Sequence, residues 1–176
     1  LCEVVSHVPA GSNGVIFTPW LHGNRCPFEA PSARGMFFNI GIETGKSSMI
    51  RAVIEGICYH CRWMLEAEAA KVSTSSTVYM AGGGASSPVI CQILADVLGR
   101  RIATQKNPQN AGAYGAAVIA AVGLGCIESV EASRNFLPNM DIYEPNPENR
   151  AVHDANFAVF QSLYYDNKKS FARLNQ

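Results

Sequence analysis

The sequence predicts an α/β fold, a β-sheet with helices packed on its faces. Three observations support this prediction. Short β-branched or apolar runs alternate with longer amphipathic stretches, in the order β-β-α-β-α-β-α-α. The chain has 176 residues, enough for one domain with its own core. Apolar residues make up 48% and charged residues 16%, a balance typical of globular proteins and not of disordered ones.

Two strands are expected early in the chain, with a loop between them. Residues 15–17 form a short apolar run that reads as a buried strand, and residues 36–40 read as a second strand. The intervening residues, 19–35, hold three prolines and two glycines, which is loop composition. The first two strands are therefore predicted to be joined by a long irregular connection.

The strongest helical pattern covers residues 48–70. Its apolar residues recur at steps of three and four positions and so share one face: Ile50, Val53, Ile54, Ile57, Cys58, Cys61, Met64 and Leu65. Charged residues, among them Arg51, Glu55 and Arg62, fall mainly on other faces. The apolar face is expected to be the buried one.

A third strand is predicted at residues 77–81, and it runs directly into Gly82, Gly83 and Gly84. Ser87 followed by Pro88 marks a helix start, because the hydroxyl caps the first turn and proline lacks only an N–H that would have no partner there. This helix is expected to stop at Gly99, and a short fourth strand follows at residues 101–104.

Two further helices complete the pattern. Asn110 is expected to cap a helix that runs to about residue 122, and its glycines and alanines predict close packing against a neighbour. Residues 123–148 have mixed composition. A last amphipathic helix is predicted at about residues 149–172.

Composition excludes several classes of partner. Fourteen basic residues balance fourteen acidic ones, so no basic stripe is present and nucleic acid is not expected to bind. No apolar run of about 18 residues predicts a membrane span. Six cysteines are scattered, which favours a reducing, cytoplasmic compartment. The C-x-x-C of Cys58 and Cys61 is attributed to an apolar helix face, because no second pair stands at zinc spacing, and no metal ligand is assigned.

The three glycines between a strand and a capped helix are the feature most typical of a ligand site. Glycine lets backbone N–H groups approach a ligand without an intervening Cβ, and the following helix points its positive end towards the same place. A nucleotide suits such a turn. A tight strand–helix connection that binds nothing explains the pattern equally well.

Two other glycine patterns are rejected. Gly45-Lys46-Ser47 is like the end of a phosphate-binding P-loop, but the first glycine of that motif falls at Ile40. A dinucleotide-binding G-x-G-x-x-G fails similarly, because Gly82 and Gly84 are followed by Ser87 where the third glycine belongs.

Several co-linear stretches carry a family pattern. Residues 14–27 match G-L-x-F-x-P-Y-L-x-G-E-R-x-P in part, and Ala33-Arg34-Gly35 follows them. Residues 51–56 match R-A-x-x-E-G. Residues 82–99 match an adenosine motif with its helix, and residues 113–117 match A-x-G-A-A. Together they resemble the FGGY family of carbohydrate kinases over residues 11 to about 125, with xylulose kinases closest in pattern. Asn24 departs from a common glutamate, and Asn39 from a usual glycine.

This resemblance implies a ribonuclease-H-like domain of the actin-like ATPase fold, a mixed sheet flanked by helices. Residues 1–176 would form most of the C-terminal, nucleotide-binding domain of a two-domain kinase whose N-terminal domain is absent. The residues that would bind the nucleotide are Gly82, Gly83, Gly84, Ser87 and Gln92. For Ser87, a role as helix cap alone is equally compatible with the sequence.

The activity implied by the resemblance is direct phosphoryl transfer from Mg-ATP to a sugar hydroxyl. The catalytic base, the phosphate loops and most sugar contacts would lie upstream, with Mg²⁺ held mainly by ATP and the missing domain. No catalytic residue is therefore expected here, Asp96 included, and the chain alone should be inactive.

Several alternatives stay open at this point. D-xylulose is the first choice of sugar, with gluconate, ribulose and glycerol behind it. A non-enzymatic binding or regulatory domain of the same fold is a second hypothesis, and a chaperone-type ATPase a third. A homodimer is one possible oligomeric state.

Overall fold

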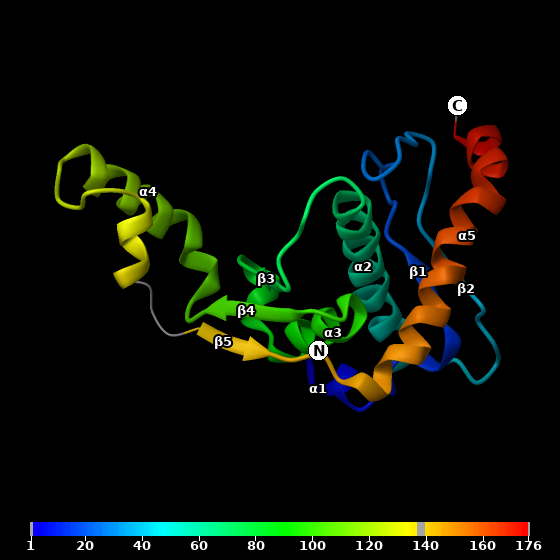
Figure 1. Ribbon diagram of the computed structural model, residues 1–176. Helices are drawn as coiled ribbons and strands as arrows, with labels where there is room; N and C mark the ends of the chain where they lie inside the picture. Colours follow the sequence, from blue (N-terminus) through cyan, green and yellow to red (C-terminus); the bar gives the residue numbers. More distant parts are fainter. Residues whose placement is uncertain (1, 137–139, 176) are drawn as a thin grey trace.

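The computed structural model describes residues 2–136 and 140–175 (Figure 1). The predicted α/β order is confirmed, with two additions, a short helix at the N-terminal end and a strand before the last helix. The helices and strands are α1 (Cys2–Ser6), β1 (Ile16–Thr18), β2 (Met36–Phe38), α2 (Lys46–Ala69), β3 (Thr77–Tyr79), α3 (Pro88–Leu98), β4 (Arg101–Gln105), α4 (Ala111–Gly123), β5 (Met140–Tyr143) and α5 (Arg150–Leu174).

The strands of the described residues form two separate sheets. β1 and β2 are an antiparallel pair, with Phe17 opposite Phe37. β3, β4 and β5 form a mixed sheet in that order, because β3 pairs parallel with β4 and β5 pairs antiparallel with β4. The parallel pair matters most for function, since the carboxyl ends of β3 and β4 meet at one edge of the sheet.

The buried face of α2 differs from the predicted one. Arg51, Glu55 and Arg62 are buried, whereas Ile57 is 50% exposed. The prediction that the apolar stripe is the buried face is therefore wrong for its centre. The charged side chains can be buried because they find partners inside the protein, which periodicity of apolar residues cannot reveal.

Arg51 and Glu55 form a buried ion pair that holds the segment before β1. Arg51 Nε lies 2.7 Å from Glu55 Oε1, and Arg51 also donates to the carbonyl oxygen of Val8 at 2.8 Å. Glu55 accepts from the Gly11 N–H at 3.0 Å and from the Ser12 hydroxyl at 2.8 Å. The R-A-x-x-E-G stretch thus fixes the path of the chain into β1.

Asn39 adopts a backbone conformation that explains why glycine is usual at its position. Its φ of 63° lies in the left-handed region, which asparagine tolerates better than most residues. Its side-chain amide also donates to the carbonyl oxygen of Gly14 at 3.1 Å. The departure from the family pattern therefore keeps the local geometry.

An aromatic cluster joins the early loop to the last helix. Trp20 is almost fully buried, and its ring centroid lies 5.4 Å from that of Phe160 on α5. The ring of Phe28 stacks on that of Tyr164, with 3.8 Å between the ring centroids, and its centroid lies 4.8 Å from that of Trp63 on α2. The prediction of an amphipathic last helix is confirmed, and its apolar side closes the core over α2 and β1.

His153 on α5 lies in the same core and contacts Tyr59 on α2. The Tyr59 hydroxyl is 2.9 Å from His153 Nδ1, and the histidine is fully buried. Burial lowers the pKa of His153, and the nearby Glu55 and Asp96 carboxylates oppose this shift only in part. The folded protein therefore favours the neutral imidazole.

Because of His153, we expect the protein to lose stability in mild acid. Because the unfolded chain binds the proton more readily, the free energy of unfolding should be unaffected by His153 above its ordinary pKa of 6.5 and should fall as the pH drops below it. Urea unfolding at about pH 7.5 and about pH 5.5 measures the difference. His153→Gln should reduce the pH dependence, leaving the part due to half-buried His60, whose pKa burial also lowers. An unchanged pH dependence in His153→Gln would contradict this assignment.

The helix rich in small residues does not pack as predicted. No residue of α4 is buried among the described residues, and the helix projects away from the body of the domain (Figure 1). The expected Asn110 side-chain cap is also absent from this helix, because Asn110 ends a 3-10 turn, Pro108–Asn110, that leads directly into α4. Within the described part of the chain, no helix combines the length and apolar composition needed to cross a bilayer.

Candidate functional site

The candidate site lies at the edge where the parallel strands β3 and β4 end. The chain leaves β3 through Gly82 and a 3-10 turn, Gly83–Ser86, and leaves β4 through residues 106–110. The two turns are bonded to each other. The Gly82 N–H donates to the carbonyl oxygen of Pro108 at 2.9 Å, and the Ser86 hydroxyl lies 3.4 Å from Gln109 Oε1. Two segments over twenty residues apart in sequence thus make one surface.

The three glycines keep this surface free of side chains. Gly82 has a φ of 89°, which strongly disfavours any residue with a Cβ. A Cβ on Gly83 would meet no atom within 4 Å, whereas one on Gly84 would come 3.0 Å from the flexible end of Met80. The backbone at Gly82 and Gly83 is therefore open to a flat ligand lying on it.

Two helices begin at the same edge. Ser87 caps α3, since its hydroxyl accepts from the Ile90 N–H at 3.3 Å, and Pro88 occupies the first helical position as predicted. α4 begins at Ala111, directly after the turn that follows β4. The amino-terminal ends of both helices carry partial positive charge, which favours oxygen-rich ligands at this edge.

Two hollows adjoin the glycine turn, and they differ in chemistry. One of about 230 Å³ has mainly apolar walls: Tyr79, Met80, Ala81, Ala103, Gln105, Ala111, Tyr114, Gly115 and Met140. The other, of about 290 Å³, is more polar: Ala85, Ser86, Pro88, Thr104, Gln105, Lys106, Asn107, Pro108, Gln109, Asp141 and Tyr143. An aromatic base suits the first, and hydroxyl or phosphate groups suit the second.

Cys91 of α3 packs against the glycine turn. Its thiol lies 3.6 Å from the carbonyl oxygen of Ala85 and 4.0 Å from the sulfur of Met80. Burial raises the pKa of this thiol, so it stays protonated and can donate to Ala85. Cys91 therefore contributes to the shape of the turn.

The side chain of Gln92 is hydrogen-bonded to residues outside the glycine turn. Its side-chain amide donates to Asp96 Oδ1 and to the carbonyl oxygen of Glu144, both at 2.8 Å. Asp96 in turn accepts from the Asn146 N–H and the Asn149 amide at 2.8 Å each. The structure thus brings Gly82, Gly83, Gly84 and Ser87 together and turns the Gln92 amide to other partners, while nucleotide contacts of all five residues stay predictions.

Asp96 is likewise occupied by structural contacts. With its oxygens accepting these three hydrogen bonds and the residue buried, it anchors the connection between β5 and α5. Within residues 2–136 and 140–175, no three His, Cys, Asp or Glu side chains are placed together to hold a metal ion.

Comparison with known proteins decides the family. A family model described as the C-terminal domain of the FGGY family of carbohydrate kinases matches residues 4–124, more than half of the chain. The chain belongs to the FGGY family. A xylulose kinase of Staphylococcus epidermidis is 32% identical over 165 residues, which cover 93% of this chain and 33% of that kinase.

Solved FGGY kinases also share the fold. The ligand-bound xylulose kinase of Lactobacillus acidophilus superposes with a TM-score of 0.85 at 28% identity, and a gluconate kinase of the same organism with 0.84 at 28%. Each match covers 98% of this chain and 35% of the kinase. The predicted actin-like ATPase fold is confirmed. The chain spans about a third of the length of the relatives that it matches.

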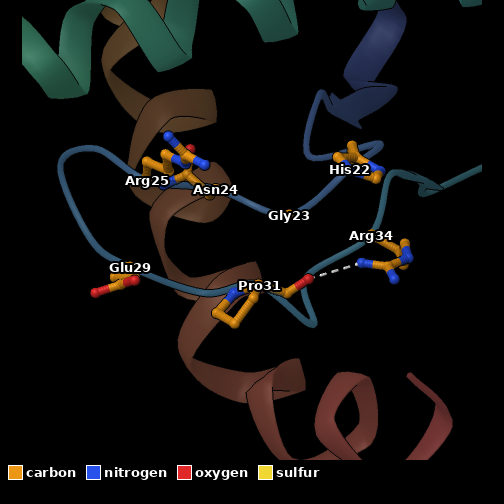
Figure 2. Close-up of a pocket in the computed structure, with 7 residues that line it drawn as sticks. All are labelled: His22, Gly23, Asn24, Arg25, Glu29, Pro31 and Arg34. Carbon is orange, nitrogen blue, oxygen red and sulfur yellow. Dashed lines mark hydrogen bonds between the residues drawn. The ribbon is translucent and has the colours of Figure 1, made fainter. Parts of the chain in front are cut away.

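The loop that carries the xylulose-kinase resemblance forms a further pocket in this FGGY domain, away from the glycine turn in sequence (Figure 2). The pocket has a volume of about 470 Å³, and its walls are His22, Gly23, Asn24, Arg25, Glu29, Pro31 and Arg34. Arg34 is held in place by the carbonyl oxygens of Pro31 at 3.0 Å and Ala33 at 2.7 Å. The walls contain two guanidinium groups and one carboxylate, so the pocket favours an anionic or hydroxyl-rich group.

Asn24 closes this loop in a way that the common glutamate cannot. Its side-chain amide donates to the carbonyl oxygens of Cys26 at 3.1 Å and Phe28 at 2.8 Å, and its backbone exchanges two hydrogen bonds with Ala30. An ionised glutamate has no hydrogen to donate. The substitution therefore changes the internal bonding of the pocket in this FGGY chain.

Sequence reasoning missed the half of the glycine-turn site that follows β4. Lys106 and Asn107 line the polar hollow, and Asn107 has a φ of 56°. A signal was present, since both residues come directly after a strand that was predicted correctly, and ligand-binding residues of α/β proteins gather at strand ends. The parallel pairing of the two strands was needed to place them beside the glycines.

Proposed function

We propose that this FGGY chain supplies the adenosine-binding half of the cleft of an ATP-dependent sugar kinase, and that it does not phosphorylate sugar alone. The observation that carries the proposal is the side-chain-free glycine surface at the carboxyl edge of β3 and β4, with an apolar hollow on one side and a polar hollow on the other. An adenosine has one apolar ring system and one hydroxylated ribose, which match the two hollows.

The chain's own part in the reaction is to bind and orient the nucleotide. The adenine would lie between the glycine turn and Tyr114, and the ribose near Ser86 and Lys106. The kinase would transfer the terminal phosphoryl group of ATP to a sugar hydroxyl, whose proton passes to a base outside this chain. In line with the family resemblance, Mg²⁺ would be held mainly by the phosphates of ATP and by the remaining part of the kinase.

D-xylulose is the sugar that we propose first. The support is the similarity to xylulose kinases together with the loop of residues 19–35, whose pocket presents hydrogen-bond donors. Gluconate is the second candidate, because the gluconate kinase superposes almost as closely as the xylulose kinase does. A carboxylate-bearing sugar also suits a pocket that contains Arg25 and Arg34.

A glycine substitution tests nucleotide binding. Gly83→Trp should abolish ADP binding, measured by titration calorimetry on the purified chain, because the indole would lie where we place the adenine. The fold should survive, since Gly83 has an ordinary backbone conformation and open space above it.

Gly41→Trp is the matched control, because a Cβ at Gly41 also meets no atom within 4 Å and lies on a loop outside the proposed site. It should bind ADP as the unchanged chain does. If Gly83→Trp keeps full affinity, the glycine turn is a structural connection and the non-enzymatic alternative gains support. Sugar phosphorylation by the chain alone would contradict the proposed division of the cleft.

A further inference from the structure

The loop of residues 19–35 is folded into a fixed shape around its pocket. Gly23 has a φ of 76°, and a Cβ there would lie 2.8 Å from the carbonyl oxygen of Pro31, so glycine is needed for the two arms of the loop to come this close. Asn24 and Ala30 exchange backbone hydrogen bonds of 3.0 and 2.8 Å across the loop, and Ala30 is buried in the main core. The pocket therefore has its shape before any ligand binds.

Two arginines of this pocket carry charges that the protein does not pair. Within the described part of the chain, neither Arg25 nor Arg34 forms an ion pair, in contrast to four other arginines: Arg51, Arg62, Arg101 and Arg150. Arg34 is half-buried, and its Nη1 donates to two backbone carbonyl oxygens of the loop. These bonds orient the guanidinium, whose other N–H groups can donate to a ligand. Figure 2 shows Arg34 and His22 on one side of Gly23 and Arg25 on the other.

Glu29 adds a group with the opposite hydrogen-bonding character. Its exposed carboxylate belongs to the walls of this pocket and of a neighbouring hollow of about 350 Å³, to which α5 contributes Lys168 and Lys169. An ionised carboxylate accepts hydrogen bonds and cannot donate them, whereas a guanidinium donates and cannot accept. A ligand that satisfies both groups therefore carries negatively charged oxygens and hydroxyl groups that donate.

The polar walls distinguish this pocket from the hollows at the glycine turn. Among the described residues that line it, Pro31 has the only apolar side chain, and no wall residue is shared with either hollow of the candidate nucleotide site. In Figure 1, the loop lies beyond α2, beside the carboxyl-terminal half of α5, whereas the carboxyl ends of β3 and β4 point towards α4. The volume of about 470 Å³ is in the range of small-molecule sites. The pocket thus suits a small polar ligand other than the adenosine.

We propose that this pocket binds a polyhydroxylated anion, a sugar that carries a carboxylate or a phosphate group, in preference to a neutral sugar. Arg25 and Arg34 hold the charged group from two sides, and Glu29 accepts from the hydroxyl groups. The inference deepens the proposed function, because it names the chemical class that the loop selects, and it rests on that function only in expecting a sugar. The charged group can come from two sources: a sugar acid that the kinase takes as acceptor, or the phosphorylated product of the transfer.

Titration calorimetry on the purified chain, without nucleotide, tests the proposal. The probes are D-xylulose, D-xylulose 5-phosphate, D-gluconate and inorganic phosphate. At least one of the two anionic sugars should bind about tenfold or more tightly than both D-xylulose and inorganic phosphate. A preference for gluconate assigns the pocket to the acceptor, and a preference for xylulose 5-phosphate assigns it to the product. If D-xylulose or inorganic phosphate binds as tightly as the better of the two anionic sugars, or if no probe binds, the proposal is overturned.

Substitutions show whether the binding takes place in this pocket. Arg25→Gln and Arg34→Gln should each weaken binding of the preferred anionic sugar about tenfold or more, and ADP binding should stay as in the unchanged chain. Arg25 is exposed, so its replacement should not change the Tm and the test does not depend on folding. Arg173→Gln is the matched control, because it removes the same charge from an exposed position of α5 outside the pocket walls, and it should change neither affinity.

The same titrations separate this proposal from the one on the nucleotide. Gly83→Trp should lose ADP but retain the anionic sugar, because the two sites share no wall residue. Full affinity for the anionic sugar in Arg25→Gln and Arg34→Gln would overturn the assignment to this pocket, whether or not the chain binds ADP.

Discussion

Gly56→Ala should strongly destabilise the domain. Gly56 lies on α2 where the helix crosses β1, and an alanine Cβ there would overlap the carbonyl oxygen of Phe17 and lie 3.0 Å from its carbonyl carbon. Backbone atoms of a strand cannot move aside as the end of a flexible side chain can. The helix would have to shift away from the strand, and we expect a loss of about 3 kcal/mol or more, at the upper end for overpacking.

Chemical denaturation followed by circular dichroism measures this effect. A loss of that size is a large part of the 5–15 kcal/mol that usually stabilises a domain. Gly41→Ala is the control, because its Cβ would meet open space and the same change of residue should leave stability nearly unchanged. If Gly56→Ala unfolds at the same denaturant concentration as the unchanged protein, the close approach of α2 to β1 is wrong.

Glu55→Gln should be nearly as damaging, although it changes one atom. The carboxylate of Glu55 is 1% exposed, and it balances the charge of Arg51 while accepting from Gly11 and Ser12. Glutamine keeps the shape but leaves the guanidinium without its counter-charge in the core. Removing one partner of a buried pair costs about 3–5 kcal/mol, and the segment of residues 8–12 should loosen at the same time.

A neighbouring pair on the same helix provides the comparison. Arg62 lies 2.8 Å from Glu66 at the same spacing of four residues, but the Glu66 side chain is 50% exposed. Glu66→Gln should therefore lower the free energy of unfolding by less than about 1 kcal/mol. Equal losses for the two variants would mean that the buried network around Glu55 contributes no more than a surface ion pair.

The regular elements could be predicted from the sequence because their signals are local. The Ser87–Pro88 start and the Gly99 stop of α3 depend on residues adjacent in the chain, and both are confirmed. β5 was missed because it is four residues long, includes Asp141, and is defined by pairing with β4. The burial of Arg51 and Glu55 depends on residues more than forty positions away, which no periodicity contains.

The candidate site could be predicted from the sequence only in part. Three adjacent glycines after a strand pointed to the turn, because their conformational freedom is a property of the residues themselves. Lys106 and Asn107 lie beside the glycine turn because β3 and β4 pair in parallel, which the sequence did not reveal. Gln92 lies one turn from the glycine segment along α3, but its amide donates to the carbonyl oxygen of Glu144 after β5, a contact between residues 52 positions apart that no local pattern reveals.

The position of α5 sets the order in which the protein can acquire its structure. Asn156 on this helix donates to the carbonyl oxygen of Gly11, 145 residues earlier in the chain, and Phe160 packs against Trp20. During synthesis the tryptophan of the early loop therefore stays uncovered until α5 has been made. Ribosome-bound intermediates that end before residue 150 should therefore expose this aromatic surface to chaperones, and release of the last helix should be the step that conceals it.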